Sequence, residues 1–476
     1  MKRVASLYIP LAFFLLIAPT LLDAKVTLPA FFSDNMVLQQ KTEAAIWGWA
    51  KPNGTVQLTS SWNKKKYTVQ ADQAGKWKLK ISTPDAGGPY DIIIKDGEAI
   101  TLHNVLIGEV WFCSGQSNME MPMKGFRDQP IKGSNDAIFN STNDWIRVYN
   151  VPRAVEKFLK DTTKSSLWKS ASPENISNFS ATAYYFGKIL QQQLRVPIAL
   201  INDSYGGSPV EAFMSIDALK EFPEIKIHSA TDTFRLNNRS PTALYNGMIR
   251  PIIGYTIKGC LWYQGEANYD RPDQYEKLFP AMISQWRGEW QQGDFPFYFA
   301  QIAPFNYAQF VANRTEKLNS AYLRDAQRKA AITIPASGII ILMDNGEEGI
   351  HPSDKETVGK RFAYLALGDT YKIKGFAYQS PSYDSLLING NIATIKFKNA
   401  PNGLTSFGKP LTQFEIAGND KVFRPATATI RNGTIILSSP LVPAPVAARY
   451  AFRDFLIGEL FSTEGFPVSS FRTDDW

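Results

Sequence analysis

The chain has 476 residues, and 44% of them are hydrophobic. This length is typical of two or three domains, and the composition excludes an intrinsically disordered protein. The formal net charge is +7, but the basic residues are scattered and form no nucleic-acid-binding module, so we expect no nucleic-acid partner.

The first 24 residues have the pattern of an export signal. Lys2 and Arg3 precede a mostly apolar stretch, Leu7–Leu22, and Ala24 offers a small residue for cleavage. We interpret residues 1–24 as a cleaved signal peptide, because the apolar stretch is short for a membrane-spanning helix and two prolines interrupt it. We therefore expect a periplasmic or extracellular protein with no stable membrane span.

Residues 25–105 have the texture of an all-β domain. Short alternating segments such as Trp77–Ile81 lie between turn signals such as Pro52-Asn53-Gly54. This spacing predicts an N-terminal β-sandwich.

Residues 106–375 alternate apolar runs with amphipathic segments of helical period. Continuous apolar strands between helices predict a parallel sheet covered on both faces, and hence an α/β core. The predicted strands are Val105–Cys113, Val196–Ile201, Thr256–Tyr263, Phe295–Ile302 and Gly338–Met343, and the predicted later helices cover roughly 273–287, 318–331 and 354–367. Residues 376–476 return to strand patterns between Asn-Gly turns, which predicts a C-terminal β domain.

The two cysteines, Cys113 and Cys260, both lie inside apolar runs. Two isolated cysteines exclude a disulfide framework and a thiolate metal site. Buried free thiols are favoured over a single bridge, which an exported protein would also permit.

Three predicted strands of the core end in polar clusters. These are Gly115–Glu120, Asn202–Ser208 and Trp262–Asn268. Because the carboxyl ends of parallel strands meet at one edge of a sheet, the clusters favour a single shared site over three unrelated turns.

A serine in this site requires a base to accept its proton. Of the three histidines, His103 lies in the predicted β-sandwich, and His228 lies in a polar segment away from any strand end. His351 follows the last predicted core strand, with acidic residues just before it. We therefore interpret Ser117 as a nucleophile toward an ester carbonyl and His351 as its base.

The same clusters contain donors for a negatively charged oxygen. The backbone N–H of Ser117, a glycine N–H from Gly206 or Gly207, and the side-chain amide of Gln264 are the predicted oxyanion hole. Each donor of this kind typically lowers the barrier by roughly 3 kcal/mol.

The motifs Gly115-Gln116-Ser117-Asn118-Met119 and Trp262-Tyr263-Gln264-Gly265-Glu266 together resemble the sialate O-acetylesterase family of the SGNH hydrolase superfamily. Further similar segments extend the resemblance from Phe32–Gln39 to Phe471-Arg472-Thr473. The resemblance implies a flavodoxin-like SGNH hydrolase core over residues 106–375, flanked by the two β domains. It also implies removal of O-acetyl groups from sugars by Ser117 and His351, without a metal or other cofactor.

One segment departs from the family pattern. Superfamily members commonly carry Asp three residues before the histidine, and many relatives read Asp-Ile-His-Pro, whereas this chain has Glu348 and then Gly349-Ile350-His351-Pro352. Glu348 is the predicted third member of the catalytic group. Glu347, Asp344 and a backbone carbonyl remain alternatives.

Other residues are weaker candidates for contact with the substrate, each with a structural alternative. They are Gln116, Tyr205, Asn246, Trp262, Glu266 and Arg324.

Several functions compete at this point. The expected partner is an O-acetylated sugar or glycan, with sialic acid implied by the resemblance and acetylated xylan or hemicellulose as the alternative. A non-catalytic carbohydrate-binding protein would not need Ser117 and His351 together. A glycosidase would need two facing carboxylates, for which only Glu266 with Glu120 or Glu211 is available.

Overall fold

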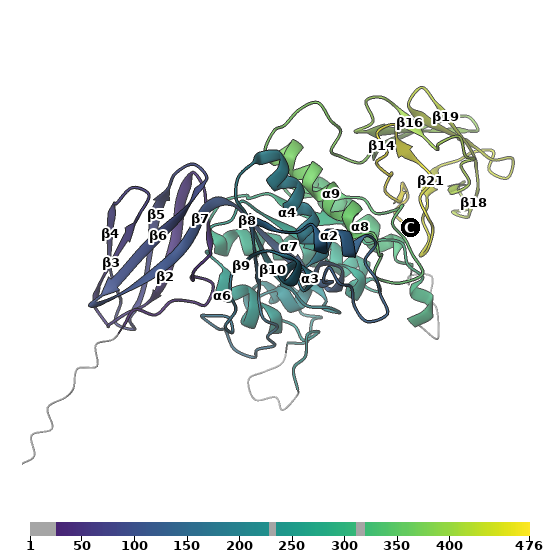
Figure 1. The fold of residues 1–476 in the computed structure, drawn as a ribbon. Coiled ribbons are helices and arrows are strands. Elements are labelled where there is room, and N and C mark those ends of the chain that lie inside the picture. Colours follow the sequence, from purple (N-terminus) through teal and green to yellow (C-terminus); the bar gives the residue numbers. More distant parts are fainter. Residues whose placement is uncertain (1–24, 228–234, 311–318) are drawn as a thin grey trace, which may run out of the picture.

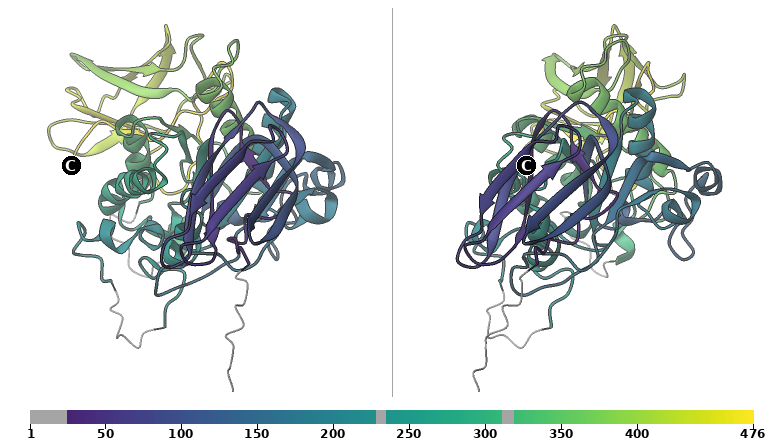
Figure 2. Two further views of the ribbon diagram at one scale, coloured as in Figure 1. Left: turned by 90° about the vertical axis from the view of Figure 1, so that its left-hand side faces the viewer. Right: turned by 60° about the vertical axis from the view of Figure 1, so that its left-hand side comes forward.

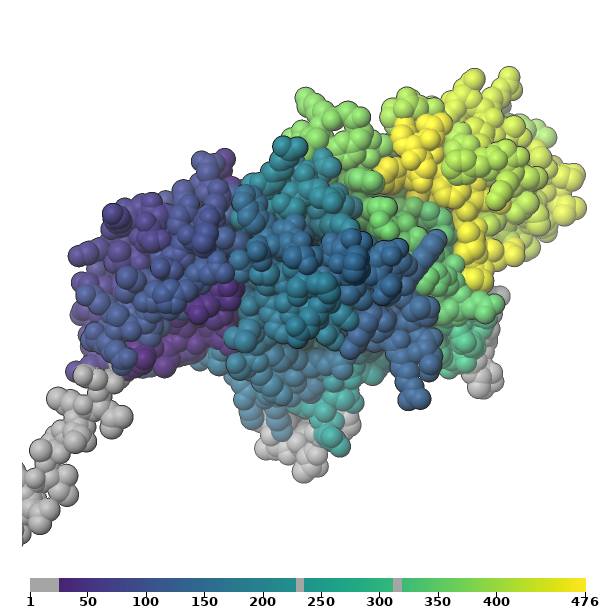
Figure 3. All heavy atoms as spheres, in the orientation of Figure 1, coloured from purple at the N-terminus to yellow at the C-terminus, as the bar shows by residue number. Residues whose placement is uncertain are grey.

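The computed structural model describes residues 25–227, 235–310 and 319–476. The predicted signal peptide, residues 1–24, and His228 lie outside these ranges. Figure 1 shows an N-terminal group of strands, a central α/β core and a C-terminal group of strands. The N-terminal strands are seen from the front in Figure 2, and Figure 3 places the two groups of strands at opposite ends of the core.

The N-terminal part contains two antiparallel arrangements of strands. β2 (Thr42–Trp49) pairs with β5 (Lys76–Thr83), and a second sheet pairs β4 with β3, β3 with β6, and β6 with β7. Ile46, Leu58 and Ile92 from these strands share one buried cluster, as their alternating pattern predicts. The remaining strands are β1 (Val37–Gln39), β3 (Thr55–Ser60), β4 (Lys66–Gln70), β6 (Gly87–Asp96) and β7 (Glu98–Gly115).

Strand β7 joins this part to the core. It is 18 residues long, and it pairs with β6 in its first half and with β10 and β11 in its second half. The predicted boundary at residue 105 therefore falls inside one continuous strand. The hydrophobic pattern changes there because every residue from Val105 to Gly115 is buried, whereas the earlier residues of the strand are exposed or half-buried except for Leu102.

The core sheet has the strand order β13-β12-β11-β7-β10-β8-β9, and it is parallel except for β9. The predicted α/β class is confirmed. Strand β8 was not predicted, because its polar ends and Arg147 interrupt the apolar run. The remaining strands are β8 (Asn143–Asn150), β9 (Lys169–Ala171), β10 (Ile198–Ser204), β11 (Gly259–Tyr263), β12 (Phe297–Ala300) and β13 (Ser337–Ile340).

Helices cover both faces of this sheet (Figure 1). Trp111 and Cys113 of β7 belong to the buried cluster that also contains residues of α4 and α9, whereas Phe112 belongs with Cys260 to the cluster that contains residues of α7 and α8. The cysteines thus lie on opposite faces and are free, as expected. The helices are α1 (Ser117–Glu120), α2 (Ser134–Phe139), α3 (Pro173–Ser177), α4 (Ala181–Leu194), α5 (Ile216–Leu219), α6 (Arg250–Ile252), α7 (Pro272–Trp290), α8 (Ala321–Thr333) and α9 (Lys355–Leu365).

The C-terminal part is antiparallel, as predicted. Its sheets have the orders β14-β15-β20-β19 and β18-β17-β21-β23, with a separate pair β16-β22. Its strands are β14 (Ser382–Asn389), β15 (Ile392–Lys398), β16 (Leu404–Thr405), β17 (Phe414–Ala417), β18 (Phe423–Pro425), β19 (Thr427–Arg431), β20 (Thr434–Ser438), β21 (Ala447–Tyr450), β22 (Phe461–Ser462) and β23 (Phe471–Arg472). Within the described ranges, the protein has no helix with the length and apolar character that crossing a membrane requires.

Candidate active site

Strand β7 presents Ser117 at the carboxyl edge of the core sheet. Gly115 has a φ of 139°, and a Cβ on this residue would lie 2.2 Å from the carbonyl oxygen of Tyr263. Glycine is therefore required for the chain to leave the strand sharply. Ser117 is then the first residue of the short helix α1, which begins directly at this turn.

The loop between β13 and α9 brings His351 to this serine. His351 Nε2 lies 2.7 Å from Ser117 Oγ, although the two residues are 234 positions apart in the sequence. The Phe126 ring packs edge-on against the imidazole, with 5.4 Å between the ring centres. A hydroxyl in hydrogen-bond contact with an imidazole is the arrangement that activates a serine nucleophile.

The other nitrogen of the imidazole contacts an amide and not a carboxylate. His351 Nδ1 is hydrogen-bonded to Oε1 of Gln129. An amide oxygen only accepts, so Nδ1 carries the proton and Nε2 is left to accept the proton of Ser117. Gln129 was missed from the sequence because it lies in a turn with no motif, and the only signal was the absence of the family's aspartate before Ile350.

The predicted role of Glu348 is therefore wrong for this structure. Glu348 is exposed, and the acidic alternatives have other partners. Glu347 accepts hydrogen bonds from the backbone and hydroxyl of Ser353, and Asp344 pairs with Arg361 at 2.6 Å. These contacts hold the carboxylates of Glu347 and Asp344 away from the ring of His351.

Burial controls the protonation of His351. Loss of solvent and the charge of Lys355 lower the pKa of His351 from 6.5 to about 4. The imidazole is therefore neutral at neutral pH, which is the form that can accept a proton.

A buried polar network supports the turn from below. Asn118, the residue after the serine, donates to Glu266 and to the carbonyl oxygen of Ile350 at 3.1 Å, and it accepts from the ammonium of Lys355. Glu266 thus binds the Ser117 turn, and its side chain makes no hydrogen bond to Gln264. The network ties the nucleophile turn, the β11 loop and the His351 loop together.

Desolvation acts on both charged members of this network. It raises the pKa of Glu266, and it lowers the pKa of Lys355 from 10.5 to about 7. Lys355 was missed in the sequence, although a signal existed. It is the first residue of α9, a position that the helix dipole makes unfavourable for a cation.

The predicted oxyanion donors have different surroundings. Ser117 begins α1, and its N–H makes no hydrogen bond to a described residue. A Cβ on Gly206 would lie 3.2 Å from Ser117 Cβ, so this glycine permits close approach, but its N–H donates to Glu120 at 2.8 Å. Gly207, with a φ of 73°, completes the turn beside it.

The side-chain amide of Gln264 is bound within the protein. Its side chain is fully buried, and Nε2 donates to the carbonyl oxygen of Ser208 at 3.1 Å and to Asn268 Oδ1 at 2.7 Å. Both amide protons are thus engaged within the protein. In this arrangement Gln264 ties two loops together, and its amide would have to leave one of these partners to act as the predicted oxyanion donor.

Tyr205 lies beside the serine turn, and a cationic side chain that the sequence did not point to, Arg153, packs on its ring. The guanidinium of Arg153 lies 4.7 Å from the centre of the Tyr205 ring, and its Nε donates to Glu120 at 2.5 Å. Arg153 side chain is 53% exposed, which leaves it accessible to a ligand. No periodic pattern marks this residue, because it lies in the loop after β8.

Four other candidates have structural roles. Trp262 is fully buried in an aromatic core. Gln116 accepts from the backbone of Ala267 at 3.1 Å, and Asn246 donates to the carbonyl oxygens of residues 156 and 157. Arg324 is completely buried and binds Ser470 and the carbonyl oxygens of residues 453 and 454, so it anchors the C-terminal part.

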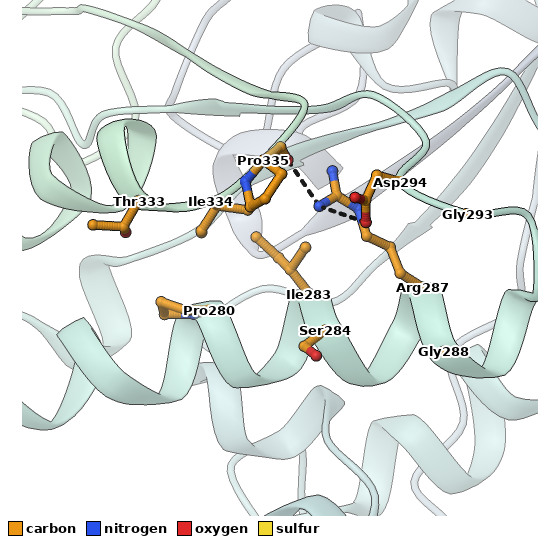
Figure 4. Close-up of a pocket in the computed structure, with 10 residues that line it drawn as sticks. All are labelled: Pro280, Ile283, Ser284, Arg287, Gly288, Gly293, Asp294, Thr333, Ile334 and Pro335. Atoms are coloured by element: carbon orange, nitrogen blue, oxygen red, sulfur yellow. Dashed lines mark hydrogen bonds and ion pairs between the residues drawn. The ribbon is translucent and has the colours of Figure 1, made fainter.

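A cavity of about 550 Å³ lies elsewhere, between α7 and the start of β13 (Figure 4). Figure 4 shows Pro280 and Ile283 of α7 on one side and Ile334 and Pro335 on the other. The loops that line it precede β12 and β13, which places it at the amino edge of the sheet. Ser117 is at the opposite edge. Among the described residues, no cluster of His, Cys, Asp and Glu is suited to hold a metal ion.

Comparison with known proteins identifies the family. A family model described as "carbohydrate esterase, sialic acid-specific acetylesterase" matches residues 107–367, more than half of the chain. The chain belongs to this esterase family. The resemblance inferred from the Gly115–Met119 and Trp262–Glu266 motifs is thereby confirmed.

Relatives of this esterase cover most of its length. Human sialate O-acetylesterase is 29% identical over 382 residues, which span 74% of this chain and 72% of the human protein. The rat enzyme is 30% identical over 411 residues, spanning 74% and 75%. A crystal structure described as a novel carbohydrate acetylesterase from Xanthomonas citri is 33% identical, covers 95% of this chain and 100% of its own, and has a TM-score of 0.86. The protein is a carbohydrate esterase.

Proposed function

We propose that this esterase removes O-acetyl groups from O-acetylated sialic acids through an acetyl-enzyme formed on Ser117. The observation that carries the mechanism is the 2.7 Å contact between Ser117 Oγ and His351 Nε2. The substrate class is supported by the relatives named sialate O-acetylesterase and by the Arg153 cation beside the serine turn.

The first half of the reaction transfers the acetyl group to the enzyme. Ser117 Oγ attacks the acetyl carbonyl carbon while His351 Nε2 takes its proton. The Ser117 N–H is the proposed first donor to the oxyanion, with the Gly206–Gly207 turn beside it. The bond to the sugar oxygen then breaks, and His351 returns the proton to the sugar hydroxyl.

The second half releases acetate. His351 takes a proton from water, the resulting hydroxide attacks the acetyl-serine, and the Ser117 alkoxide leaves and takes the proton back. Gln129 has the role of orienting the imidazole and keeping the proton on Nδ1. Because an amide carries no charge, Gln129 stabilises the imidazolium less than a carboxylate would.

One observation favours a second substrate class. Glu120 already pairs with Arg153 at 2.5 Å, which reduces the attraction of this site for the sialic acid carboxylate. An acetylated neutral sugar, as in xylan or other hemicellulose, is the second candidate. The Xanthomonas citri relative is named by its carbohydrate acetylesterase activity without a particular sugar.

We also propose that the protein is exported to the periplasm or beyond the cell, on the evidence of residues 1–24. Expression of the full chain followed by N-terminal sequencing of the mature protein tests this proposal. A mature N-terminus near Lys25 is expected, and an intact Met1 on the protein in the cell would contradict it.

The deciding experiment compares acetate release from 9-O-acetylated sialic acid and from acetylated xylan oligosaccharides. We expect release from the sialic acid, and we expect Ser117→Ala to reduce kcat by about 10⁴-fold or more while the fold is retained. Release from xylan alone would keep the mechanism and replace the substrate. Equal activity of Ser117→Ala and the wild type would overturn the mechanism.

A further inference from the structure

A second groove lies between the N-terminal strands and the core. Its volume is about 340 Å³, and strands β2 and β5 form one wall while the segment Arg250–Ile253 of the core forms the other. The neighbouring residue Ala45 donates to Thr256 Oγ1 at 3.0 Å, just before the start of β11. The groove is therefore at the amino edge of the core sheet, whereas Ser117 follows the carboxyl edge.

The strand wall presents indole rings and lysines together. Trp47 and Trp49 are two residues apart on β2, and they pair with Lys78 and Lys76 on β5. Alternation along a strand places these four side chains on the same face. The ammonium of Lys78 lies 5.5 Å from the centre of the Trp47 ring. Aromatic surface beside a few polar groups is typical of a small-molecule site.

The groove has more positive charge than its carboxylates balance. Lys76 forms an ion pair with Asp161 at 2.8 Å across the groove. Lys78 and Arg250 form no ion pair with any carboxylate among the described residues. Partial burial lowers the pKa of Lys78, and the charges of Lys80 and Arg250 lower it further. An anion bound between Lys78 and Arg250 would remove this repulsion.

We propose that this groove binds an acidic sugar residue. The carboxylate of the sugar pairs with Lys78 and Arg250, and the sugar ring lies against the indole of Trp47 or Trp49. A volume of about 340 Å³ is at the low end for ligand pockets and suits one sugar residue. The groove thus holds a glycan at a position remote from the ester that Ser117 attacks.

The test measures binding of acidic oligosaccharides to the Ser117→Ala full-length protein by calorimetry and tryptophan fluorescence. The probes are a glucuronic acid-containing oligosaccharide, a sialyl oligosaccharide without acetyl groups, and a neutral oligosaccharide of the same length. We expect at least one acidic probe to bind, with an affinity that weakens as salt is added, and the neutral probe to bind at least 10-fold more weakly.

Three variants locate the binding. The double variant Lys78→Met/Arg250→Met removes both unpaired charges and is expected to weaken binding of the acidic probe at least 10-fold. Lys80→Met is the matched control, because Lys80 is on the same face of β5 but does not line the groove, and it is expected to change binding less than about 3-fold, far less than the double variant. Arg153→Met removes the cation that is proposed to meet a sialic acid carboxylate beside Ser117, so it reports binding at the active site, and the part of the binding that the double variant loses is expected to remain in it.

The proposal is overturned if no acidic probe binds, if the neutral probe binds equally well, or if Arg153→Met abolishes binding while the double variant retains it. Hydrolysis of 4-nitrophenyl acetate by the double variant in the Ser117 background shows that the fold and reacting groups are intact. Failure to release acetate from sialic acid would overturn the proposed function and leave this proposal unaffected, because Ser117→Ala protein is used for binding.

Discussion

The polar turns that follow β7 and β11 have similar composition but different orientation. After β7, Ser117 points outward to His351 Nε2 at 2.7 Å. After β11, the side chains of Gln264 and Glu266 point inward and bind other parts of the protein. One turn carries the proposed nucleophile, and the other binds that turn through Glu266 and Asn118.

This difference shows that a polar residue at the end of a strand can either face the site or bind within the protein, so its polarity alone does not indicate its role. In both turns a glycine with positive φ redirects the chain, at Gly115 and at Gly265. What differs is the set of partners: Ser208 and Asn268 take both amide protons of Gln264, whereas no backbone group takes the proton of Ser117 Oγ. Four substitutions test the distinction.

Gln264→Ala has the largest expected effect. It removes the side-chain donor to the buried carbonyl oxygen of Ser208 and one of the two donors to Asn268 Oδ1, which still accepts from the N–H of Val210, and it opens a small cavity. We expect a loss of about 3 kcal/mol in the free energy of unfolding, with kcat changed less than about 3-fold in the folded protein. Denaturant unfolding and steady-state kinetics measure the two quantities.

Gln379→Ala is the matched control, because Gln379 is exposed, and its stability should equal that of the wild type. A Gln264→Ala protein of normal stability whose kcat falls by 10²-fold or more would reverse the comparison. It would return Gln264 to the oxyanion hole, since loss of one such donor typically costs about this much.

Gln129→Ala removes the acceptor of the His351 Nδ1 proton. We expect kcat to fall by about 10²-fold, or about 2.7 kcal/mol, while the unfolding midpoint stays constant, because Gln129 is on the surface. Gln129→Glu should restore most of kcat. Its carboxylate also favours the imidazolium, so the acid limb of kcat/KM should move to higher pH.

Asp128→Asn in the same turn controls for effects on the loop. Wild-type kcat in Gln129→Ala would show that another group holds the ring. The wild-type acid limb itself is expected near pH 4, because burial and Lys355 lower the His351 pKa to about 4 and the protonated form cannot act as base.

Lys355→Met tests whether the buried network around Asn118 also controls the protonation of His351. Glu266, Glu347 and Asp354 attract the Lys355 ammonium, and the ammonium repels the His351 imidazolium. Removing it should move the acid limb up by about one pH unit. Lys360→Met on the exposed side of α9 is the control. An unchanged acid limb would mean that burial alone lowers the pKa.

The same variant should change stability with pH. The unfolded chain binds the Lys355 proton up to a pKa of 10.5, and the folded chain only up to about 7. The wild-type free energy of unfolding therefore gains from this group as pH rises from about 7 to 10.5. Lys355→Met should lack that gain.

Much of the fold was predictable because buried positions are occupied by apolar residues in a pattern that can be recognised in the sequence. The predicted helix 273–287 corresponds to Pro272–Trp290, and the run Val196–Ile201 corresponds to Ile198–Ser204, since residues buried on both faces of a sheet are continuously apolar. The run Val105–Cys113 gave no sign that it belongs to a strand beginning at Glu98. The hydrogen bonding of β7 continues across the domain boundary, whereas the hydrophobic pattern of the sequence changes there.

The parts of the site in which the chemistry restricts the residue type were predictable. The parts in which the orientation of a side chain sets its role were not. The proposed reaction needs a serine and a base, and the predicted pair, Ser117 and His351, meets at the sheet edge. Gln129 and Gln264 are the same residue type, and which of them faces the imidazole depends on the packing of loops remote in sequence. No local pattern records that choice.

Substitution at the third strand end, after β10, has the smallest predicted effect. It tests whether a polar side chain at a strand end can be purely buried. Asp203 is fully buried between Asn202 and Ser204, and its carboxylate oxygens make no hydrogen bond to a described residue. Desolvation raises the Asp203 pKa well above 3.8, so the folded protein holds this proton more tightly than the unfolded chain and loses stability as pH rises above 3.8.

Asp203→Asn keeps the shape of the side chain and removes its charge. At pH 7 it should raise the melting temperature, by on the order of 2–4 °C for each kcal/mol recovered, and the gain should shrink toward pH 4. The exposed Asp475→Asn should change neither value, and kcat should be unchanged, because a side chain buried behind the edge supports the site without contact with the reacting atoms. A lower melting temperature at pH 7 would mean that Asp203 is charged and paired in solution.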